Sequence, residues 1–442
     1  MKDSRAYNRE YADILREKDY YQDYLKAQEN IRNSTAYYDG EPVDFEYMPK
    51  MYTVDDYAQM CKATSEVYDV LTTVIAQYQK DAAFRALMNF DKRIEELMLV
   101  SSLYDNLLPM CRIDFFYDED NGAYKLCEIN TDGSSGMNED RELVNMMKQT
   151  EAYKQFSLHC NLDDFELFES WAEAFLTLYR QYKSGLPNVA IVDFLDDDGP
   201  PVEFLPFQRA FEKKGMETVI CDVRELEYRE NSLFKGGFRI DAIYRRLVTG
   251  DVERRYDEVP VGFIQACLKN EVCLIGNFAT QAVHNKKLFE IVHGEYAKQF
   301  LSAAQLAAAK KYFPYTKVFS PQDDIEEFIE TKDKWILKPL DFYASKDVYA
   351  GREKDVDTWR KMLITAREQG QLIQEYVRPY QVGFPAYDNN GRLDFKDYNI
   401  ISGIYMYAGR PSGLFTRIGP NAVISSINGG KTQPSFLVSE KE

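Results

Sequence analysis

Histidine is scarce in this 442-residue sequence, and its cysteines lack the spacing of a paired motif. There are three histidines, and the seven cysteines form no CxxC pair. A tetrahedral zinc site draws its four ligands from such residues at short spacing, so the sequence argues against structural zinc. The same cysteine usage predicts a reduced, cytoplasmic setting in which the thiols pack in the interior.

Long apolar runs and an excess of positive charge are also missing. No uncharged apolar stretch approaches about eighteen residues, and residues 1–20 are polar, so we expect neither membrane anchoring nor export. The formal net charge of -18 repels polyanions, which argues against a nucleic-acid partner and requires a local basic site for any phosphate ligand. The same field favours a cationic co-substrate such as a polyamine, although an acidic surface also serves solubility alone.

Apolar and aromatic residues, by contrast, are plentiful. They make up 45% and 14% of the chain, which predicts a folded protein, and the length predicts several subdomains. Together the local patterns indicate an α/β fold. We expect the following regions: 1–110, mainly helical; 111–185, a hairpin and helices; 186–284, a small parallel α/β unit; 285–380, strands and a helix; and 381–442, C-terminal strands.

The spacing of apolar residues predicts where the individual elements lie. Helical periodicity runs through residues 53–98 and again through 139–182. Alternating or wholly apolar runs bounded by turn residues predict strands. The expected strands are a strand-turn-strand hairpin at 112–130 and single strands at 189–194, 240–244, 335–339 and 372–377, with a helix at 356–368.

The hairpin carries the strongest chemical signal. Alternation along paired strands can put the side chains of Asp114, Glu128 and Asn130 on one face. Oxygen ligands of this kind suit octahedral Mg²⁺, which keeps waters and phosphate oxygens in its other positions. Arg112 lies on the same side of its strand as Asp114, where it can bind a terminal phosphate with two hydrogen bonds. Taken alone, the spacing also fits a solvent-facing hairpin that carries charge.

Later segments supply groups that suit a nucleotide. Lys338 ends an apolar strand, where its ammonium group is held rigidly and can meet a phosphate. Residues 343–348 offer small side chains and backbone N–H groups for a triphosphate, and residues 372–377 offer a strand edge for adenine. Each feature is weak on its own, because a lysine at a strand end is usually just solvated.

A family resemblance joins these segments. The motifs RIDFFYDEDNGAYKLCEIN, NKK, WILKPL, LIQEYV and GLFTR, in this order, resemble those of the glutathionylspermidine synthase family, a branch of the ATP-grasp ligases. The likeness spans roughly residues 112–438 and concerns the synthetase part only, without the amidase domain fused to it in that family. It implies a circularly permuted ATP-grasp fold, because Glu128 precedes Lys338, whereas the order is reversed in most ATP-grasp enzymes. Residues 186–284 would then be the preATP-grasp unit and residues 285–380 the nucleotide-binding lid.

The resemblance implies a role for each matching residue. The expected magnesium ligands are Asp114, Glu128 and Asn130; the phosphoryl and oxyanion arginines are Arg112 and Arg417; the ATP-binding residues are Lys286, Lys338, Ser345, Gln374, Glu375 and Tyr376; and the residues near the carboxylate substrate are Asp132, Ser135 and Glu139. Two of these have an ordinary alternative, since Arg417 also fits a surface arginine and Glu139 a carboxylate at a helix start.

The implied activity is ATP- and Mg²⁺-dependent joining of a carboxylate to an amine through an acyl phosphate. The loop at 342–351 would close over the triphosphate and keep water out, although it is poorer in glycine than the loop of the family. Glutathione and a polyamine are the family's namesake substrates, yet a peptide, an amino acid or another acid would fit the same motifs. A phosphotransferase on the same scaffold and a catalytically idle nucleotide-binding protein are the two alternatives.

Overall fold

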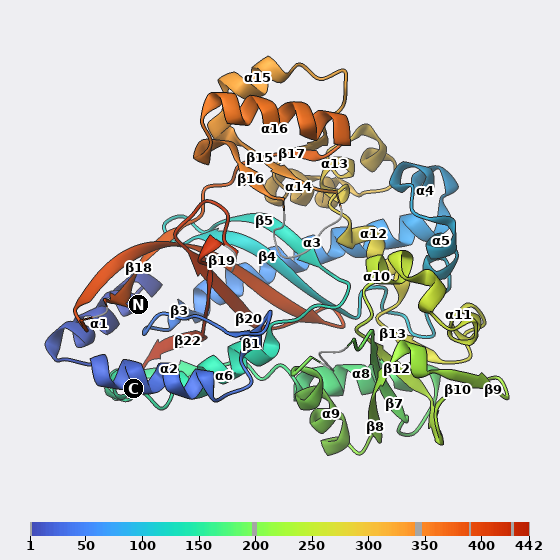
Figure 1. The fold of residues 1–442 in the computed structure, drawn as a ribbon, viewed down its shortest axis with the longest axis horizontal. Coiled ribbons are helices and arrows are strands. Elements are labelled where there is room, and N and C mark those ends of the chain that lie inside the picture. Colours follow the sequence, from blue (N-terminus) through green and yellow to red (C-terminus); the bar gives the residue numbers. More distant parts are fainter. Residues whose placement is uncertain (1, 197–200, 341–346, 389, 426–427, 442) are drawn as a thin grey trace.

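A central antiparallel sheet joins the parts of the molecule in the computed structural model (Figure 1). The structure describes residues 2–196, 201–340, 347–388, 390–425 and 428–441. A small α/β layer lies above this sheet in the view, and a parallel sheet lies below it to the right. The strand order of the central sheet is β21-β20-β19-β4-β5, and β18 also pairs with β19. Its strands are β4 (Met110–Asp118), β5 (Ala123–Asn130), β18 (Gln381–Tyr387), β19 (Leu393–Tyr407), β20 (Arg410–Gly419) and β21 (Lys431–Gln433).

Helices cover one face of this sheet. The N-terminal elements are α1 (Ser4–Glu17), α2 (Tyr21–Arg32), β1 (Tyr37–Tyr38), β2 (Glu41–Pro42), β3 (Lys50–Thr53), α3 (Val54–Lys80), α4 (Ala82–Met88) and α5 (Lys92–Met98). The long α3 begins at a capping box, in which the Thr53 hydroxyl accepts from the Asp56 N–H and the Asp56 carboxylate accepts from the Thr53 N–H.

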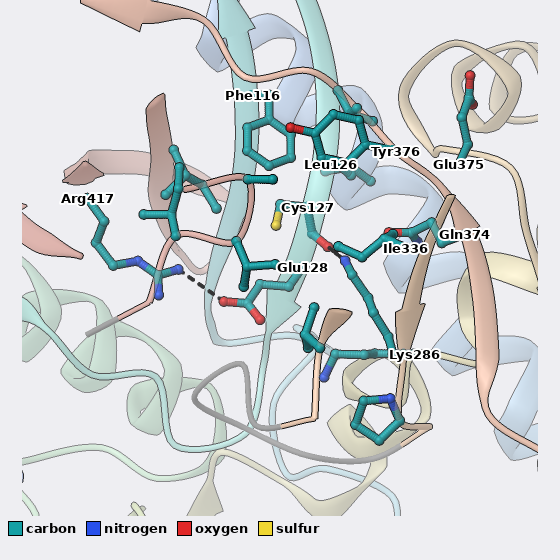
Figure 2. A pocket seen from close by; sticks show the side chains of 18 residues that line it. Phe116, Leu126, Cys127, Glu128, Lys286, Ile336, Gln374, Glu375, Tyr376 and Arg417 are labelled. Carbon is teal, nitrogen blue, oxygen red and sulfur yellow. Dashed lines mark hydrogen bonds and ion pairs between the residues drawn. The ribbon is translucent and has the colours of Figure 1, made fainter. Parts of the chain in front are cut away.

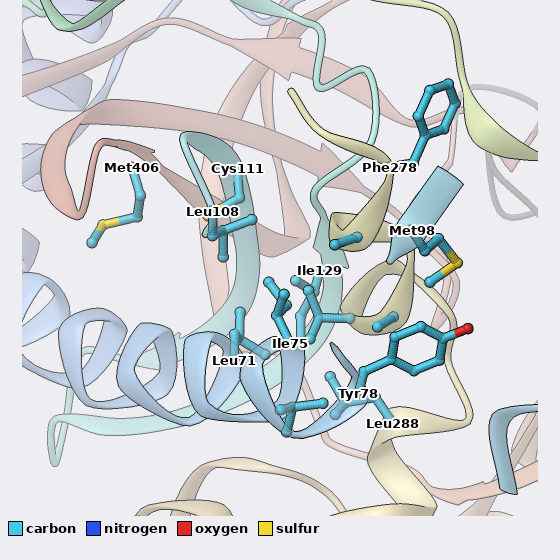
Figure 3. Packing of buried hydrophobic residues seen from close by; sticks show 14 of the residues in the cluster. Leu71, Ile75, Tyr78, Met98, Leu108, Cys111, Ile129, Phe278, Leu288 and Met406 are labelled. Carbon is cyan, nitrogen blue, oxygen red and sulfur yellow. The ribbon is translucent and has the colours of Figure 1, made fainter. Parts of the chain in front are cut away.

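The helical spacing of the α3 apolar residues places them on the sheet. Leu71 and Ile75 lie beside Leu108 and Ile129, and all four are buried (Figure 3). Burying a side chain of this size contributes about 1.5–3 kcal/mol. The predicted amphipathic pattern therefore fixes the helix against the strand that carries Glu128.

The stretch that we expected to be helical throughout, 139–182, contains a strand. It folds as α6 (Met137–Met147), α7 (Glu151–Phe156), β6 (Cys160–Asp163) and α8 (Glu169–Tyr182). The strand β6 pairs with β22 (Ser435–Glu440), which also pairs with β3. The expectation was wrong at β6 because its partner lies far away in the sequence, where local periodicity gives no signal.

The parallel unit has the sheet order β13-β12-β7-β8. Its strands β7 (Val189–Asp193), β8 (Thr218–Asp222), β12 (Ala242–Arg245) and β13 (Cys273–Ile275) all run parallel, as predicted. The chain passes from β7 to β8 on one side and then to β12 on the other, so the order reverses between β7 and β12. The other elements of this unit are α9 (Phe204–Lys213), β9 (Glu227–Arg229), β10 (Ser232–Lys235), β11 (Phe238–Ile240), α10 (Thr249–Arg254) and α11 (Val261–Leu268).

A second small sheet, of order β14-β17-β15-β16, carries the expected nucleotide segments. The elements of this region are α12 (Gln281–His284), α13 (Leu288–Ile291), α14 (Ala303–Tyr312), β14 (Thr316–Val318), α15 (Ile325–Glu330), β15 (Trp335–Lys338), β16 (Tyr349–Ala350), α16 (Val356–Gln369) and β17 (Leu372–Glu375). Trp359 and Leu363 of α16 pack on Leu337 and Ile373 of the sheet. No helix within the described ranges has the length and apolar character needed to cross a membrane.

Candidate active site

The β4–β5 hairpin brings the predicted magnesium ligands together. Asp114 is opposite Glu128, and Arg112 is opposite Asn130. Because the side chains alternate along both strands, these four project from one face of the sheet. Asp114 is only 1% exposed, whereas the side chain of Glu128 is 19% exposed. The buried carboxylate therefore needs charged or polar partners.

Two arginines supply those partners. The Arg112 guanidinium donates to both oxygens of Asp114, through Nε at 2.7 Å and Nη2 at 3.0 Å. Arg417, on β20, donates through Nη2 to Asp114 Oδ2 at 2.9 Å and to Glu128 Oε1 at 3.1 Å. The Asn130 amide donates to Asp114 Oδ2 at 3.2 Å. Residues separated by about 290 positions in the chain thus form one charged cluster at the centre of the sheet.

The pKa values of the two carboxylates in this cluster shift in opposite directions. Although burial acts to raise it, the pKa of Glu128 is held well below its usual range by Arg417, Lys286 and further cations nearby. Burial raises the pKa of Asp114 against the attraction of Arg112 and Arg417. A divalent cation on the same oxygens would add charge that favours the ionised form of both carboxylates.

The donor set fits Mg²⁺. Two carboxylates and an amide oxygen from paired strands are hard oxygen ligands, and Mg²⁺ ordinarily takes only one or two carboxylates from a protein. Among the residues that the structure describes, no group of three or more His, Cys, Asp and Glu side chains is placed to hold a metal. The oxygen donors therefore suit an ion that completes its shell with water and phosphate.

A pocket of about 710 Å³, open solvent included, extends from Glu128 toward the second small sheet. Figure 2 shows the Glu128 side chain pointing toward Arg417 at one end, with Gln374 and Tyr376 at the other. Charged side chains thus line one end of the pocket, and the strand edge at 374–376 lines the other. Its lining residues are Phe116, Leu126, Cys127, Glu128, Lys286, Ile336, Lys338, Pro339, Val348, Gln374, Glu375, Tyr376, Val377, Ile401, Arg417, Ala422, Val423 and Ile424.

The two predicted phosphate-binding lysines lie on this pocket. Lys338 is the last residue of β15, is 7% exposed, and donates from Nζ to the Cys127 carbonyl oxygen at 3.1 Å. Lys286 follows α12, and its backbone N–H donates to the Leu340 carbonyl at 3.1 Å. Both ammonium groups lower the pKa of Glu128, after Arg417, so they lie within electrostatic reach of the carboxylate cluster.

The expected adenine segment forms the far wall. The Gln374 amide donates to the Thr316 hydroxyl at 2.8 Å and is buried. The backbone N–H of Tyr376 donates to the Lys334 carbonyl at 2.7 Å. Glu375 lines the pocket but is an exposed residue, and its carboxylate accepts from the Tyr315 N–H at 3.4 Å. These contacts hold the strand edge in a fixed position beside the apolar part of the pocket.

The three residues expected near a carboxylate substrate lie outside the pocket. Asp132 forms a buried ion pair through Oδ1 with Arg245 Nη2 at 2.5 Å. Its Oδ2 accepts from the Thr249 N–H. The Ser135 carbonyl accepts from Arg112 Nη1 at 2.5 Å, which connects its loop to the charged cluster. Glu139 is in the first turn of α6. Residues 342–346 of the expected lid, which include Ser345, lie outside the described residues.

Sequence reasoning missed several neighbours of the site. Tyr405, opposite Arg112 on β19, donates to the Ser135 carbonyl at 2.8 Å. Glu203 and Arg246 form an ion pair of 3.0 Å beside the start of α6. Tyr405 lies in the region 381–442 that we expected to form strands, but only the pairing of β19 with β4 shows that it is opposite Arg112. Nothing local marks Glu203, because its partners are more than 40 residues away.

These features define an α/β fold in which the carboxylate-bearing strand precedes the lysine-bearing strand in the chain. No model of a known protein family matches the sequence. No curated protein matches it either.

The chain is similar in fold to a glutathione synthetase-like effector from Globodera pallida, solved in its apo form. The TM-score is 0.63 and the sequence identity 12%, over 94% of this chain and 96% of that one, so the likeness concerns the fold alone. A gamma-glutamylcysteine synthetase-like protein from Methylobacillus flagellatus gives a TM-score of 0.42 and 12% identity, over 85% of each chain. The D-cycloserine synthetase DcsG gives 0.29 and 14%, over 56% of this chain and 91% of that one.

Proposed function

We propose that the protein is an ATP- and Mg²⁺-dependent ligase that joins a carboxylate to an amine. The observation that carries the proposal is the single pocket lined by Glu128, Lys286, Lys338 and Arg417 at one end and by Gln374 and Tyr376 at the other. One proposed carboxylate ligand, the cations proposed to bind phosphate and a surface that would suit a purine thus share one cavity. The fold shared with a glutathione synthetase-like effector supports the proposal at the level of architecture.

In the proposed reaction, Lys286 and Lys338 hold the phosphates of ATP while Arg112 meets the transferred phosphoryl group. Mg²⁺ held by Asp114, Glu128 and Asn130 would neutralise charge on the phosphate oxygens. The substrate carboxylate attacks the γ-phosphorus, the bond to the β-phosphate oxygen breaks, and ADP leaves. An amine then attacks the carbonyl carbon of the acyl phosphate, and phosphate departs.

Arg417 is placed to stabilise the oxyanion that this second attack creates. Its Nη2 bridges Asp114 and Glu128, so the guanidinium lies beside the proposed metal ligands, where it would meet the developing negative charge. A preorganised donor of this kind contributes about a hundredfold to a thousandfold in kcat.

The proposed function also indicates the classes of substrate. We infer a small-molecule or peptide carboxylate as the acid and a cationic amine, for example a polyamine, as the nucleophile. Glutathione and spermidine are the first pair to test, because the sequence motifs resemble those of glutathionylspermidine synthases.

A trapping assay tests this function. The protein, ATP and Mg²⁺ are incubated with a panel of carboxylic acids and hydroxylamine, and mass spectrometry detects hydroxamates while a coupled assay measures free phosphate. We expect an acid-dependent hydroxamate with one phosphate released per product, and loss of both with Asp114→Asn. A phosphorylated product without free phosphate would instead establish the phosphotransferase alternative.

A further inference from the structure

One face of the second small sheet forms a wall of the pocket. In this sheet Gln374 of β17 lies between Thr316 of β14 and Ile336 of β15, and each of them is its direct partner in register. Directly paired residues project from the same face of a sheet. The neighbouring residues Leu337 and Ile373 project from the other face, where they pack against α16. The side chain of Gln374 therefore points away from α16 and lines the pocket (Figure 2).

A chain of hydrogen bonds fixes the orientation of the Gln374 amide. The Thr316 hydroxyl donates to the Pro314 carbonyl oxygen at 3.0 Å. A hydroxyl group has a single proton, so the Thr316 oxygen can only accept from Gln374, whose Nε2 donates to it at 2.8 Å. Thr316 and Gln374 are 1% and 4% exposed, so these bonds are shielded from bulk water. The amide nitrogen is thereby held against Thr316.

This arrangement leaves the amide oxygen of Gln374 for a ligand. Among the residues that the structure describes, no donor is bound to Gln374 Oε1. Phe116, Ile336 and Val423 give the same pocket an apolar surface. A buried acceptor in such surroundings loses free energy when it has no partner, so a ligand that brings a donor is favoured over one that does not.

We propose that Gln374 makes the pocket specific for a purine with an amino group at C6, and that Thr316 is the positioning residue behind this specificity. The inference deepens the ATP site of the proposed function and rests on it. Adenine has an N–H donor at C6, which Oε1 can accept, whereas guanine and hypoxanthine have an oxygen there. The amide could donate to that oxygen only by turning over. Its own oxygen would then face the Thr316 oxygen, whose proton is already bound to Pro314.

Nucleotide binding tests this specificity without an acid or an amine substrate. ADP and inosine diphosphate, which differ only at C6 and N1 of the base, are titrated by calorimetry in the presence of Mg²⁺. We expect the wild-type protein to bind ADP about a hundredfold more tightly, because inosine diphosphate leaves two buried acceptors facing each other. Equal affinities for the two nucleotides, or the absence of binding by either, would overturn the proposal.

A pair of variants at Thr316 tests the positioning role. Thr316→Val removes the hydroxyl but keeps the shape of the side chain, and Thr316→Ser is the matched control because it keeps the hydroxyl. Without the hydroxyl the amide can turn over, so the preference of Thr316→Val for ADP over inosine diphosphate should fall to about tenfold or less. Thr316→Ser should retain the wild-type preference. An unchanged preference in Thr316→Val, with both nucleotides weakened equally, would show that Thr316 has a structural role only.

A variant of Gln374 tests the contact itself and does not depend on the folding of the Thr316 variants. Gln374→Met keeps the volume of the side chain and removes the acceptor, while purine riboside diphosphate, with hydrogen at C6, removes the donor. We expect the wild-type protein to prefer ADP over this analogue by about tenfold, and Gln374→Met to bind the two within about twofold. A preference that survives in Gln374→Met would show that another group reads the amino group. The ligase function fails separately, if the wild-type protein binds ADP selectively but yields no hydroxamate with any acid.

Discussion

Arg417 contacts both carboxylates of the proposed metal site, and this double contact makes its role testable. Its side chain is 21% exposed, and burial opposes its charge while Asp114 and Glu128 raise its pKa above the ordinary value. The guanidinium is thus permanently charged and lies at the partly exposed side of the carboxylate cluster. Each carboxylate that Arg417 contacts also has a second cation nearby. We therefore expect Arg417 to contribute more to the reaction than to the folding stability of the protein.

We expect Arg417→Ala to lower kcat for amide formation by about a hundredfold to a thousandfold with little change in the affinity for ATP. The reason is that Arg417 would act on the oxyanion, whereas Lys286 and Lys338 would hold the nucleotide. Steady-state kinetics and nucleotide titration measure the two effects. Arg410→Ala, at the exposed start of the same strand, is the control and should leave both quantities unchanged.

Single residues of the site differed in how well the sequence predicted them. Alternation and strand ends are local properties, so the strand positions of Asp114, Glu128 and Lys338 could be predicted from the sequence. No local pattern indicated Glu203, which reaches α6 from a different part of the chain. Asp132 illustrates the opposite case, since its position in a glycine-containing loop suggested a ligand contact, while its side chain is buried against Arg245.

At the scale of elements, the site depends on how closely β19 lies against β4. Gly403 is opposite Asp114 in this pairing. A Cβ atom at Gly403 would overlap Asp114 Oδ1 and would come within 3.0 Å of the Arg112 side chain. Glycine at this point therefore leaves the space in which the Arg112–Asp114 ion pair lies.

Gly403→Ala should displace the Asp114 carboxylate and lower activity by about a hundredfold or more, while the protein still folds. Misplacing a catalytic group by about 1 Å is enough for a loss of this size. The Mg²⁺ concentration for half-maximal activity should rise in the same variant. Gly383→Ala on β18 is the control, because its nearest neighbour would be Asp397 Oδ1 at 3.5 Å, an ordinary contact. Normal kinetics in Gly403→Ala would show that the close approach has no importance.

Most of the elements around the site were predictable, since they depend on local patterns. The hairpin at 112–130, the parallel strands and the helix at 356–368 are present within a few residues of the expected bounds. The predicted strand at 240–244 proved to be the end of β11 followed by β12, because Asp241 interrupts the run. The sheet β3-β22-β6 could not be predicted, because each of its pairings joins segments more than 270 residues apart.

At the scale of the whole molecule, three distant regions share the pocket. Lys338 donates to the Cys127 carbonyl, and the Ala422 N–H donates to the Glu353 carboxylate at 2.6 Å. These contacts join the nucleotide sheet to the central sheet on both sides of the cavity. Few apolar contacts accompany them within the part of the chain that the structure describes, where the buried members of the cluster at this junction are Ile336, Ala350 and Val423. A bound nucleotide should therefore stabilise this junction.

Hydrogen exchange can measure that stabilisation. With Mg²⁺ and a non-hydrolysable ATP analogue at about a hundred times Kd, binding contributes about 2.7 kcal/mol, so exchange through openings that release the ligand should slow by about a hundredfold. We expect this protection in β15, β17 and residues 422–424. The helices α1 and α2, far from the pocket, serve as the internal reference and should not change (Figure 1). Uniform protection across the chain, or protection elsewhere only, would contradict the proposed nucleotide site.

The pairing of β19 with β4 has a consequence for biosynthesis. Residue 115 hydrogen-bonds in register with residue 402, so one edge of the early hairpin has no strand partner until the C-terminal part of the chain leaves the ribosome. At about 5–20 residues per second this delay lasts tens of seconds. During that time an apolar strand edge is open to wrong pairing with other nascent chains. Synthesis of this protein should therefore depend on holdase chaperones, and slow translation should lower its soluble yield.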